Sequence, residues 1–197
     1  TDAGGTLSFA EGDSAAVIDS ALSLSDDDDA NLANATISIS SGFVNSEDVL
    51  AFTPVSGSTI TGSWDGINGV LTLSGNATKA QYEAALETVT YQNTNTDNPN
   101  NGSRTVSWVV NDGAADSSAI TSTIGVTAVN DAPVLAGAGQ SVTFTLSGPD
   151  IVIDSTLVVS DVDDVDIESA TISISSGFDG SVDSLAFTPV SGSTITG

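Results

Sequence analysis

An internal repeat is the feature that most constrains the fold of this chain. The thirteen residues LAFTPVSGSTITG at 50–62 recur without change at 185–197, which is 135 positions later. The same offset relates ATISISSGF at 35–43 to its second copy at 170–178. A gapless offset of this kind indicates tandem duplication of one structural unit. We therefore expect a complete repeat over 1–131 and the first half of a second, homologous repeat over 132–197.

The first repeat alternates apolar and polar residues in short runs, which is the period-2 pattern of half-buried strands. In the run 35–41, Ile37 and Ile39 fall on one face and the intervening hydroxyl residues fall on the other. One face of the resulting sheet should therefore be wet and the other buried. The predicted strands span 6–10, 16–25, 35–41, 69–73, 88–92, 104–110 and 119–129.

Turn residues and one helical pattern separate these strands. Asp65-Gly66 with Asn68-Gly69 predicts one tight hairpin, and Asn111-Asp112-Gly113 predicts another, because Asn and Gly tolerate positive φ. The segment 78–87 instead has Tyr82 and Leu86 four residues apart, which favours one short helix. Seven or more short strands with regular turns predict an all-β fold, with a Greek-key β-sandwich in each repeat.

The charge balance excludes several classes of function. The chain has 26 acidic side chains against two basic ones, a formal net charge of -24, and neither His nor Cys. Nucleic acids and anionic membranes would repel it. Zinc, haem and iron-sulfur sites lack their usual ligands, disulfides are impossible, and no apolar run is long enough to insert into a membrane.

Aspartates are concentrated where the predicted strand 16–25 ends. They occupy 26–29, and the equivalent place in the second repeat holds Asp161, Asp163, Asp164 and Asp166. So many neighbouring carboxylates repel one another unless a cation neutralises them, and Ca²⁺, with six to eight oxygen ligands, is the natural candidate. The alternative is an acidic turn that is simply solvated.

Strand directions predict which carboxylates meet. If 119–129 runs toward the linker 130–133, strand 6–10 runs the same way and ends beside the linker, whereas 16–25 runs the opposite way. The first repeat should therefore carry one acidic set at the junction with the second repeat and another at its far end. The junction set comprises Glu11, Asn130, Asp131, Asp161 and Asp163, with Asp164 as a further candidate. The far-end set comprises Asp26, Asp28 and Asp112.

Several of these motifs together support a family resemblance. Asn130-Asp131-Ala132-Pro133, followed by Asp161-Val162-Asp163, is similar to the calcium linker of cadherin-type tandem repeats. With ATISISSGF at 35–43, AQYEAAL at 80–86 and VVNDG at 109–113, the chain resembles the cadherin-like repeats of giant bacterial RTX-type adhesins. In that family the linker and the Asp-x-Asp loop supply calcium ligands, which the resemblance carries to the junction set.

The same resemblance implies an Ig/cadherin-like sandwich and a structural role. It implies an extracellular, bacterial cell-surface protein, secreted by a type I system, in which calcium stiffens a fibre of neighbouring repeats for adhesion or biofilm formation. No nucleophile or marked acid-base pair suggests an enzyme. Two alternatives remain open: a carbohydrate- or peptide-binding module, and a split scaffold that brackets an inserted ligand-binding domain.

Two weaker signals each have two interpretations. The acidic loops at 45–48 and 179–183 are either further ion sites or solvated turns. Trp64 and Trp108 are either platforms on which a sugar stacks or residues packed in the core and turns, and packing is the interpretation favoured here.

Overall fold

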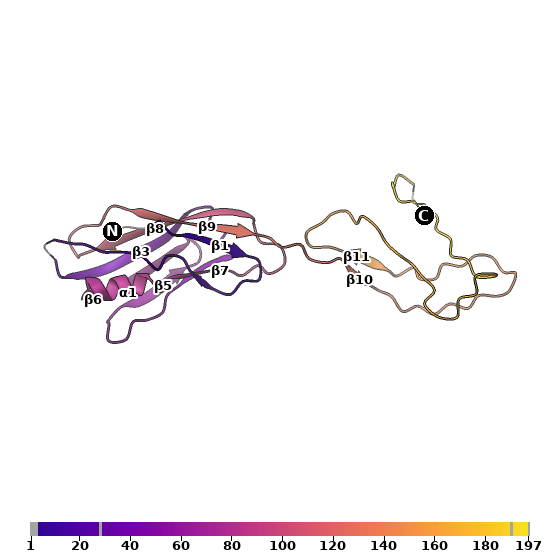
Figure 1. The fold of residues 1–197 in the computed structure, drawn as a ribbon, viewed down its shortest axis with the longest axis horizontal. Coiled ribbons are helices and arrows are strands. Elements are labelled where there is room, and N and C mark those ends of the chain that lie inside the picture. Colours follow the sequence, from indigo (N-terminus) through magenta and orange to yellow (C-terminus); the bar gives the residue numbers. More distant parts are fainter. Residues whose placement is uncertain (1–3, 28, 190, 197) are drawn as a thin grey trace. The chain divides into compact units, whose positions relative to one another are not determined.

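The computed structural model of the chain describes residues 4–27, 29–189 and 191–196. The chain divides into two compact units, Thr1–Asp163 and Asp164–Gly197. The described residues of the first unit contain three β-sheets and the helix that Figure 1 labels α1. This division reflects how compactly the chain folds and does not coincide with the boundary between the sequence repeats at 131/132. That boundary stays a prediction.

Two sheets build the first repeat, and the predicted all-β sandwich is confirmed. The six-stranded sheet has the order β1 (Thr6–Ala10), β9 (Ile120–Thr127), β8 (Gly102–Asn111), β3 (Asn31–Ser41), β6 (Val70–Thr78), β5 (Thr61–Asp65). The three-stranded sheet has the order β2 (Ala16–Val17), β7 (Thr90–Asn93), β4 (Asp48–Ala51). β1 pairs with β9 in parallel, and the other pairs in both sheets are antiparallel.

The core lies between the faces that the period-2 pattern predicts. In β3, Ile37 and Ile39 are 0% and 4% exposed, while Ser38 between them is partly exposed. Phe9 and Tyr91 pack edge to face, with ring centroids 5.1 Å apart, and join the six-stranded sheet to the three-stranded one. This geometry contributes beyond simple area burial. The predicted alternation is therefore confirmed in the strand that the repeat analysis singled out.

The predicted helix is present as α1 (Lys79–Leu86), between β6 and β7. Thr78 is its N-cap and forms a reciprocal capping box with Gln81, which satisfies backbone N–H groups that the first turn leaves free. Tyr82 and Leu86 are buried, and the Tyr82 hydroxyl donates to the carbonyl of Gly75 at 2.7 Å. The i, i+4 pair that predicted the helix is thus the face that it buries.

The predicted strand 16–25 is mostly wrong, since only Ala16–Val17 forms β2. After it the chain bends around Asp19, whose carboxylate accepts from the backbone N–H groups of Gly5 (2.8 Å) and Ala21 (3.0 Å). Ser122 donates to the same carboxylate at 3.2 Å, so Asp19 is held inside the sandwich. Backbone N–H groups that donate to a buried aspartate cannot also pair with a neighbouring strand, so the chain turns here and does not continue as a β-strand.

Two strands and one connection differ from the prediction. Strands β4 and β5 were not predicted, because their runs are short and carry polar residues beside the turns. The turn predicted at 111–113 is a longer connection between β8 and β9, in which Asp112 Oδ1 accepts from the N–H groups of Ala114 (2.7 Å) and Ala115 (2.8 Å). The hairpin between β5 and β6, predicted at 65–69, is confirmed.

The second repeat reproduces one local turn of the first. Its strands β10 (Val134–Ala136) and β11 (Val158–Ser160) pair antiparallel. Asp154 accepts from the N–H groups of Gln140 (3.2 Å) and Thr156 (2.8 Å), as Asp19 does from residues 135 positions earlier. The duplication seen in the sequence is therefore also a duplication of local hydrogen bonds.

The strands of the first repeat are not all reproduced. ATISISSGF forms most of β3 in its first copy, but its second copy, at 170–178, forms no strand. Ile172 is 71% exposed, whereas its counterpart Ile37 is 0% exposed. β3 is held between β6 and β8. Among the described residues, 170–178 pairs with no strand.

Candidate calcium sites at the two ends of the first repeat

Glu11 lies beside the linker, as the strand directions predicted. β1 and β9 run in parallel with Ala10 opposite Thr127, and the N–H group of Glu11 donates to the carbonyl of Thr127 at 2.9 Å. Its side-chain Oε2 accepts from the N–H group of Val129 at 2.8 Å. Two segments that are 118 positions apart in sequence therefore meet at the linker.

The other oxygen of this carboxylate, Oε1, is buried and accepts no hydrogen bond from the described residues. Buried polar atoms are normally paired, because an unpaired one loses its hydration without compensation. A carboxylate with one oxygen on the backbone and one buried oxygen free is a suitable ligand for a hard cation. The structure thus carries, at the predicted junction, a donor that fits Ca²⁺.

The remaining junction residues form a short chain of hydrogen bonds. The N–H group of Asp131 donates to Asp163 Oδ2 at 2.5 Å, and the N–H group of Asp163 donates to Asp161 Oδ1 at 3.0 Å. The side-chain amide of Asn130 donates to the carbonyl of Asp131 at 2.5 Å. The Asp-x-Asp loop therefore folds back onto the linker, 32 positions away in sequence from Asp131.

The sequence did not identify Asn98 as a partner of this loop. Its side-chain amide donates to the carbonyl of Val162 at 3.0 Å. Asp164, the further junction candidate, belongs to the second compact unit. Within the described ranges, no group of three or more acidic side chains is close enough to hold a metal ion. Calcium binding at the junction therefore stays a prediction, supported by the buried oxygen of Glu11.

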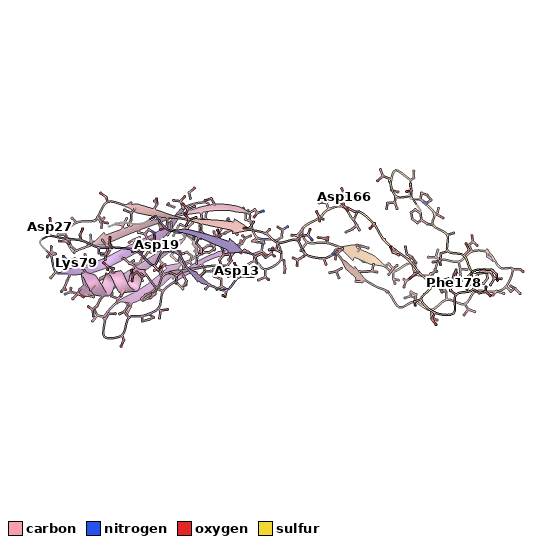
Figure 2. All side chains as sticks on the ribbon, viewed as in Figure 1. Asp13, Asp19, Asp27, Lys79, Asp166 and Phe178 are labelled. Carbon is pink, nitrogen blue, oxygen red and sulfur yellow. The ribbon has the colours of Figure 1, made fainter. Side chains whose placement is uncertain are left out.

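The far end of the first repeat contains a cavity of about 260 Å³. Asp26 and Asp112 both line it, which confirms that the ends of these two connections meet. Asp28, the third member of the predicted set, lies outside the described residues. Figure 2 shows Asp27 and Lys79 at this end of the first unit, and Asp13 at the opposite end. The cavity lining comprises Leu24, Ser25, Asp26, Leu32, Lys79, Val110, Asp112, Ala115, Asp116 and Ser117.

Two local effects reduce the need for a metal at this cavity. The backbone N–H groups of Ala115 and Ala114 donate to Asp112 and hold the pKa of its carboxyl below its ordinary value. The ammonium group of Lys79 also lines the cavity and donates to the backbone carbonyl of Asp26. The far end therefore has a cation of its own, whereas the described junction residues include no Lys or Arg.

The weaker acidic loop at 45–48 has a structural role that the sequence did not reveal. Asp48 and Arg104 are each 1% exposed, and Arg104 Nε lies 3.3 Å from both carboxylate oxygens of Asp48. The Tyr91 hydroxyl donates to Asp48 Oδ1 at 2.5 Å, and burial with this bond raises the pKa of Tyr91. The carboxylate that suggested an ion site is thus neutralised by the only arginine of the chain.

Glu47 belongs to the same buried cluster. Burial alone would raise its pKa, but the N–H group of Asn100 and the side-chain amide of Asn95 donate to the carboxylate and lower the pKa overall. Its Oε2 lies 3.8 Å from Arg104 Nη2. The sequence carried one signal for this cluster, because its single arginine stands among 26 acidic side chains and a carboxylate is therefore its expected partner. Which carboxylates pair with it depends on how the strands pair.

Trp108 is a core residue, as the packing interpretation predicted. It is 2% exposed, and its Nε1 donates to Ser122 Oγ at 3.0 Å. Trp64 is partly buried and packs edge to face on Phe43, with ring centroids 6.2 Å apart. Neither indole is therefore a freely exposed platform for a sugar.

Comparisons with known proteins give one partial match. No family model matches the chain, and no solved structure matches it. In the described part of the chain, no helix is long and apolar enough to cross a membrane. The chain is 38% identical over 86 residues to halomucin from Haloquadratum walsbyi, an alignment that covers 42% of this chain and 1% of that protein. This chain is therefore similar to a small part of a very long protein.

Proposed function

We propose that the chain is a non-enzymatic extender segment of an extracellular adhesin, in which Ca²⁺ stiffens the junction between tandem β-sandwich repeats. The observation that carries the proposal is the carboxylate of Glu11. It contacts the linker through one oxygen and keeps the other buried and without a hydrogen-bond partner among the described residues. An ion bound there would connect β1 to the linker.

The physical mechanism is linkage between ion binding and folding. An ion that binds only the folded arrangement stabilises it by about 2.7 kcal/mol when its free concentration is a hundred times the dissociation constant. Without a cation, self-repulsion in a chain with a net charge of -24 destabilises the close approach of these carboxylates. Calcium is therefore expected to raise both the stability of the first repeat and the stiffness of the linker.

The surface location rests on separate support. The partial match is to halomucin, which suggests a surface protein. The resemblance of the linker to cadherin-like adhesin repeats adds the bacterial cell surface, type I secretion and a role in adhesion or biofilm formation. In this proposal the partners are neighbouring repeats of the same protein, which hold a ligand-binding module away from the cell.

A second candidate is a split scaffold, in which an inserted ligand-binding domain separates the two halves of a repeat. The observation that favours it is the exposure of Ile172 and Leu185, whose counterparts in the first copy, Ile37 and Leu50, are buried. It differs from the first candidate because it predicts a partner segment rather than an ion.

The test compares calcium with chelator in the Glu11→Gln variant of the full chain. Thermal unfolding measures stability, and small-angle scattering measures stiffness. Asp97→Asn is the matched control, because it removes the same charge from an exposed side chain that accepts no hydrogen bond from the described residues. We expect calcium to stabilise and stiffen the parent and the control but not Glu11→Gln. Equal responses in all three proteins, or no response in the parent, would reject the junction site.

A further inference from the structure

A loop rich in asparagine connects β7 to β8. We call residues 94–101 the asparagine loop, because four of its eight residues are asparagine. The side chain of Asn95 closes this loop on itself. Its Oδ1 accepts from the N–H groups of Asp97 (3.1 Å) and Asn98 (3.2 Å), and its Nδ2 donates to the carbonyl of Asn98 at 2.7 Å. Because Pro99 is almost fully buried, the closed loop is also anchored to the body of the first repeat.

The buried cluster of Glu47 and Arg104 fixes the position of the asparagine loop. Glu47 Oε1 accepts from the side-chain amide of Asn95 at 3.2 Å, and its Oε2 accepts from the N–H group of Asn100 at 2.9 Å. Arg104 Nη1 donates to the carbonyl of Asn100 at 2.7 Å. Hydrogen bonds to charged groups are stronger than neutral ones. The loop is therefore held by residues of the first repeat and does not depend on the linker for its shape.

Two side chains of the asparagine loop contact the junction. Asn101 Oδ1 accepts from the N–H group of Ala128, just before the linker, at 2.9 Å. Asn98 Nδ2 donates to the carbonyl of Val162 at 3.0 Å, across 64 positions of sequence. Val162 is the middle residue of the Asp-x-Asp loop. The asparagine loop thus holds the linker at one point and the Asp-x-Asp loop at another.

The bond from Asn98 suits a region of like charges. Asp131, Asp161 and Asp163 bring three carboxylates to this region, and neighbouring carboxylates repel one another. A side-chain amide is neutral, and here it donates to a backbone carbonyl that lies between two of the aspartates. It can therefore hold the Asp-x-Asp loop in place without adding a positive charge that would compete with a cation.

We propose that Asn98 is a positioning residue, which holds the Asp-x-Asp loop beside the linker independently of any cation and so prepares the junction for an ion. The second half of this inference rests on the proposed function. An ion that binds a loop already in place does not also have to order it, so its apparent affinity is higher. The buried cluster of Glu47 and Arg104, through the asparagine loop, is in this way part of the support of the junction.

The first test measures amide hydrogen exchange by NMR in chelator, so that calcium has no part in the outcome. The N–H group of Asp131 is the probe, because it donates to Asp163 Oδ2 only while the Asp-x-Asp loop lies beside the linker. Asn98→Ala removes the donor to Val162 but keeps the backbone groups that bond to Asn95, so the asparagine loop stays closed. We expect exchange at Asp131 to become about threefold to tenfold faster, as for the loss of one hydrogen bond.

Asn100→Ala is the matched control. It removes the same amide group from the same loop, but the Asn100 side chain is exposed and makes no hydrogen bond with the described residues. Exchange at Asp131 should therefore be the same in this variant as in the parent. Urea unfolding followed by tryptophan fluorescence should give all three proteins the same midpoint, since neither side chain belongs to the core. Exchange that is unchanged in Asn98→Ala, or equally faster in both variants, would overturn the proposal.

The second test separates this inference from the proposed function. Calorimetry measures calcium binding to the parent, Asn98→Ala and Asn100→Ala. We expect Asn98→Ala to bind the same number of ions with an affinity about threefold to tenfold lower, and Asn100→Ala to match the parent. If the parent binds no calcium, the proposed calcium site is rejected, while the exchange at Asp131 still decides whether Asn98 holds the loop. Equal affinity in all three proteins would overturn the role of Asn98 in preparing the junction for an ion.

Discussion

Arg104→Gln should be among the most destabilising single changes in the first repeat. Arg104 is 1% exposed, with Nε 3.3 Å from both oxygens of the equally buried Asp48. Its Nη1 also donates to the carbonyls of Asn100 (2.7 Å) and Gly102 (3.3 Å). Removing one partner of a buried ion pair typically costs about 3–5 kcal/mol, because the other charge stays buried without compensation.

That cost is large against the total stability of a domain, which is about 5–15 kcal/mol. Urea unfolding followed by tryptophan fluorescence is a suitable assay, because Trp64 and Trp108 both lie in the first repeat. Lys79→Gln is the matched control, since it changes the net charge equally but breaks one hydrogen bond of a partly exposed side chain. We expect this control to lose at most about 1.5 kcal/mol.

A double-mutant cycle with Asp48→Asn separates the ion pair from other effects of the substitution. Asparagine keeps an oxygen that accepts the Tyr91 hydroxyl but removes the buried charge, so Asp48→Asn should restore part of the stability lost in Arg104→Gln. If Arg104→Gln and Lys79→Gln differ by less than about 1 kcal/mol, or if the cycle shows no coupling, the reasoning about this buried pair is refuted.

Three further predictions concern the fold. Ile37→Ala should lower the unfolding free energy by about 2–4 kcal/mol. Ile172→Ala, in the identical local sequence, should change it by less than about 0.5 kcal/mol. Urea unfolding measures both losses, and equal losses would contradict the burial of Ile37 and the exposure of Ile172. Thr78→Ala should cost about 1 kcal/mol through loss of the helix cap, and Thr78→Ser should retain most of it. Hydrogen bonds hold the pKa of Asp19 below its ordinary 3.8, so its contribution to stability is present above pH 3.8 and is lost as the pH falls toward the lower folded-state pKa. Asp19→Asn should therefore flatten the acid limb of a stability-versus-pH curve, and an unchanged limb would reject this assignment.

Much of the first repeat could be predicted because its signals are local. The alternation around Ile37 and Ile39 identifies a strand and its buried face, since side chains of a strand point to opposite sides in turn. Tyr82 and Leu86 identify the helix, because residues four apart share one helical face. Strand directions, taken from connectivity alone, then brought Glu11 to the linker and Asp26 to the neighbourhood of Asp112.

Features that depend on distant partners were missed. The bend at Asp19 is made by N–H groups of residues 4 and 5, and the alternating pattern of 16–25 carries no trace of them. The neutralisation of Asp48 depends on Arg104, 56 positions away. An acidic loop that is solvated, one that binds an ion and one that is buried against arginine share the same local sequence pattern, so charge alone could not separate them.

The two copies of ATISISSGF show most directly what sequence decides and what tertiary structure decides. By itself, the sequence determined the duplication, the strand periodicity, the helix and the hairpin turn at 65–69. Only the tertiary structure decided that Ile37 lies in a central strand and Ile172 in an exposed, unpaired segment. The physical reason is that turn hydrogen bonds close within a few residues, whereas a strand is stabilised by ladders and side-chain contacts that other strands must supply.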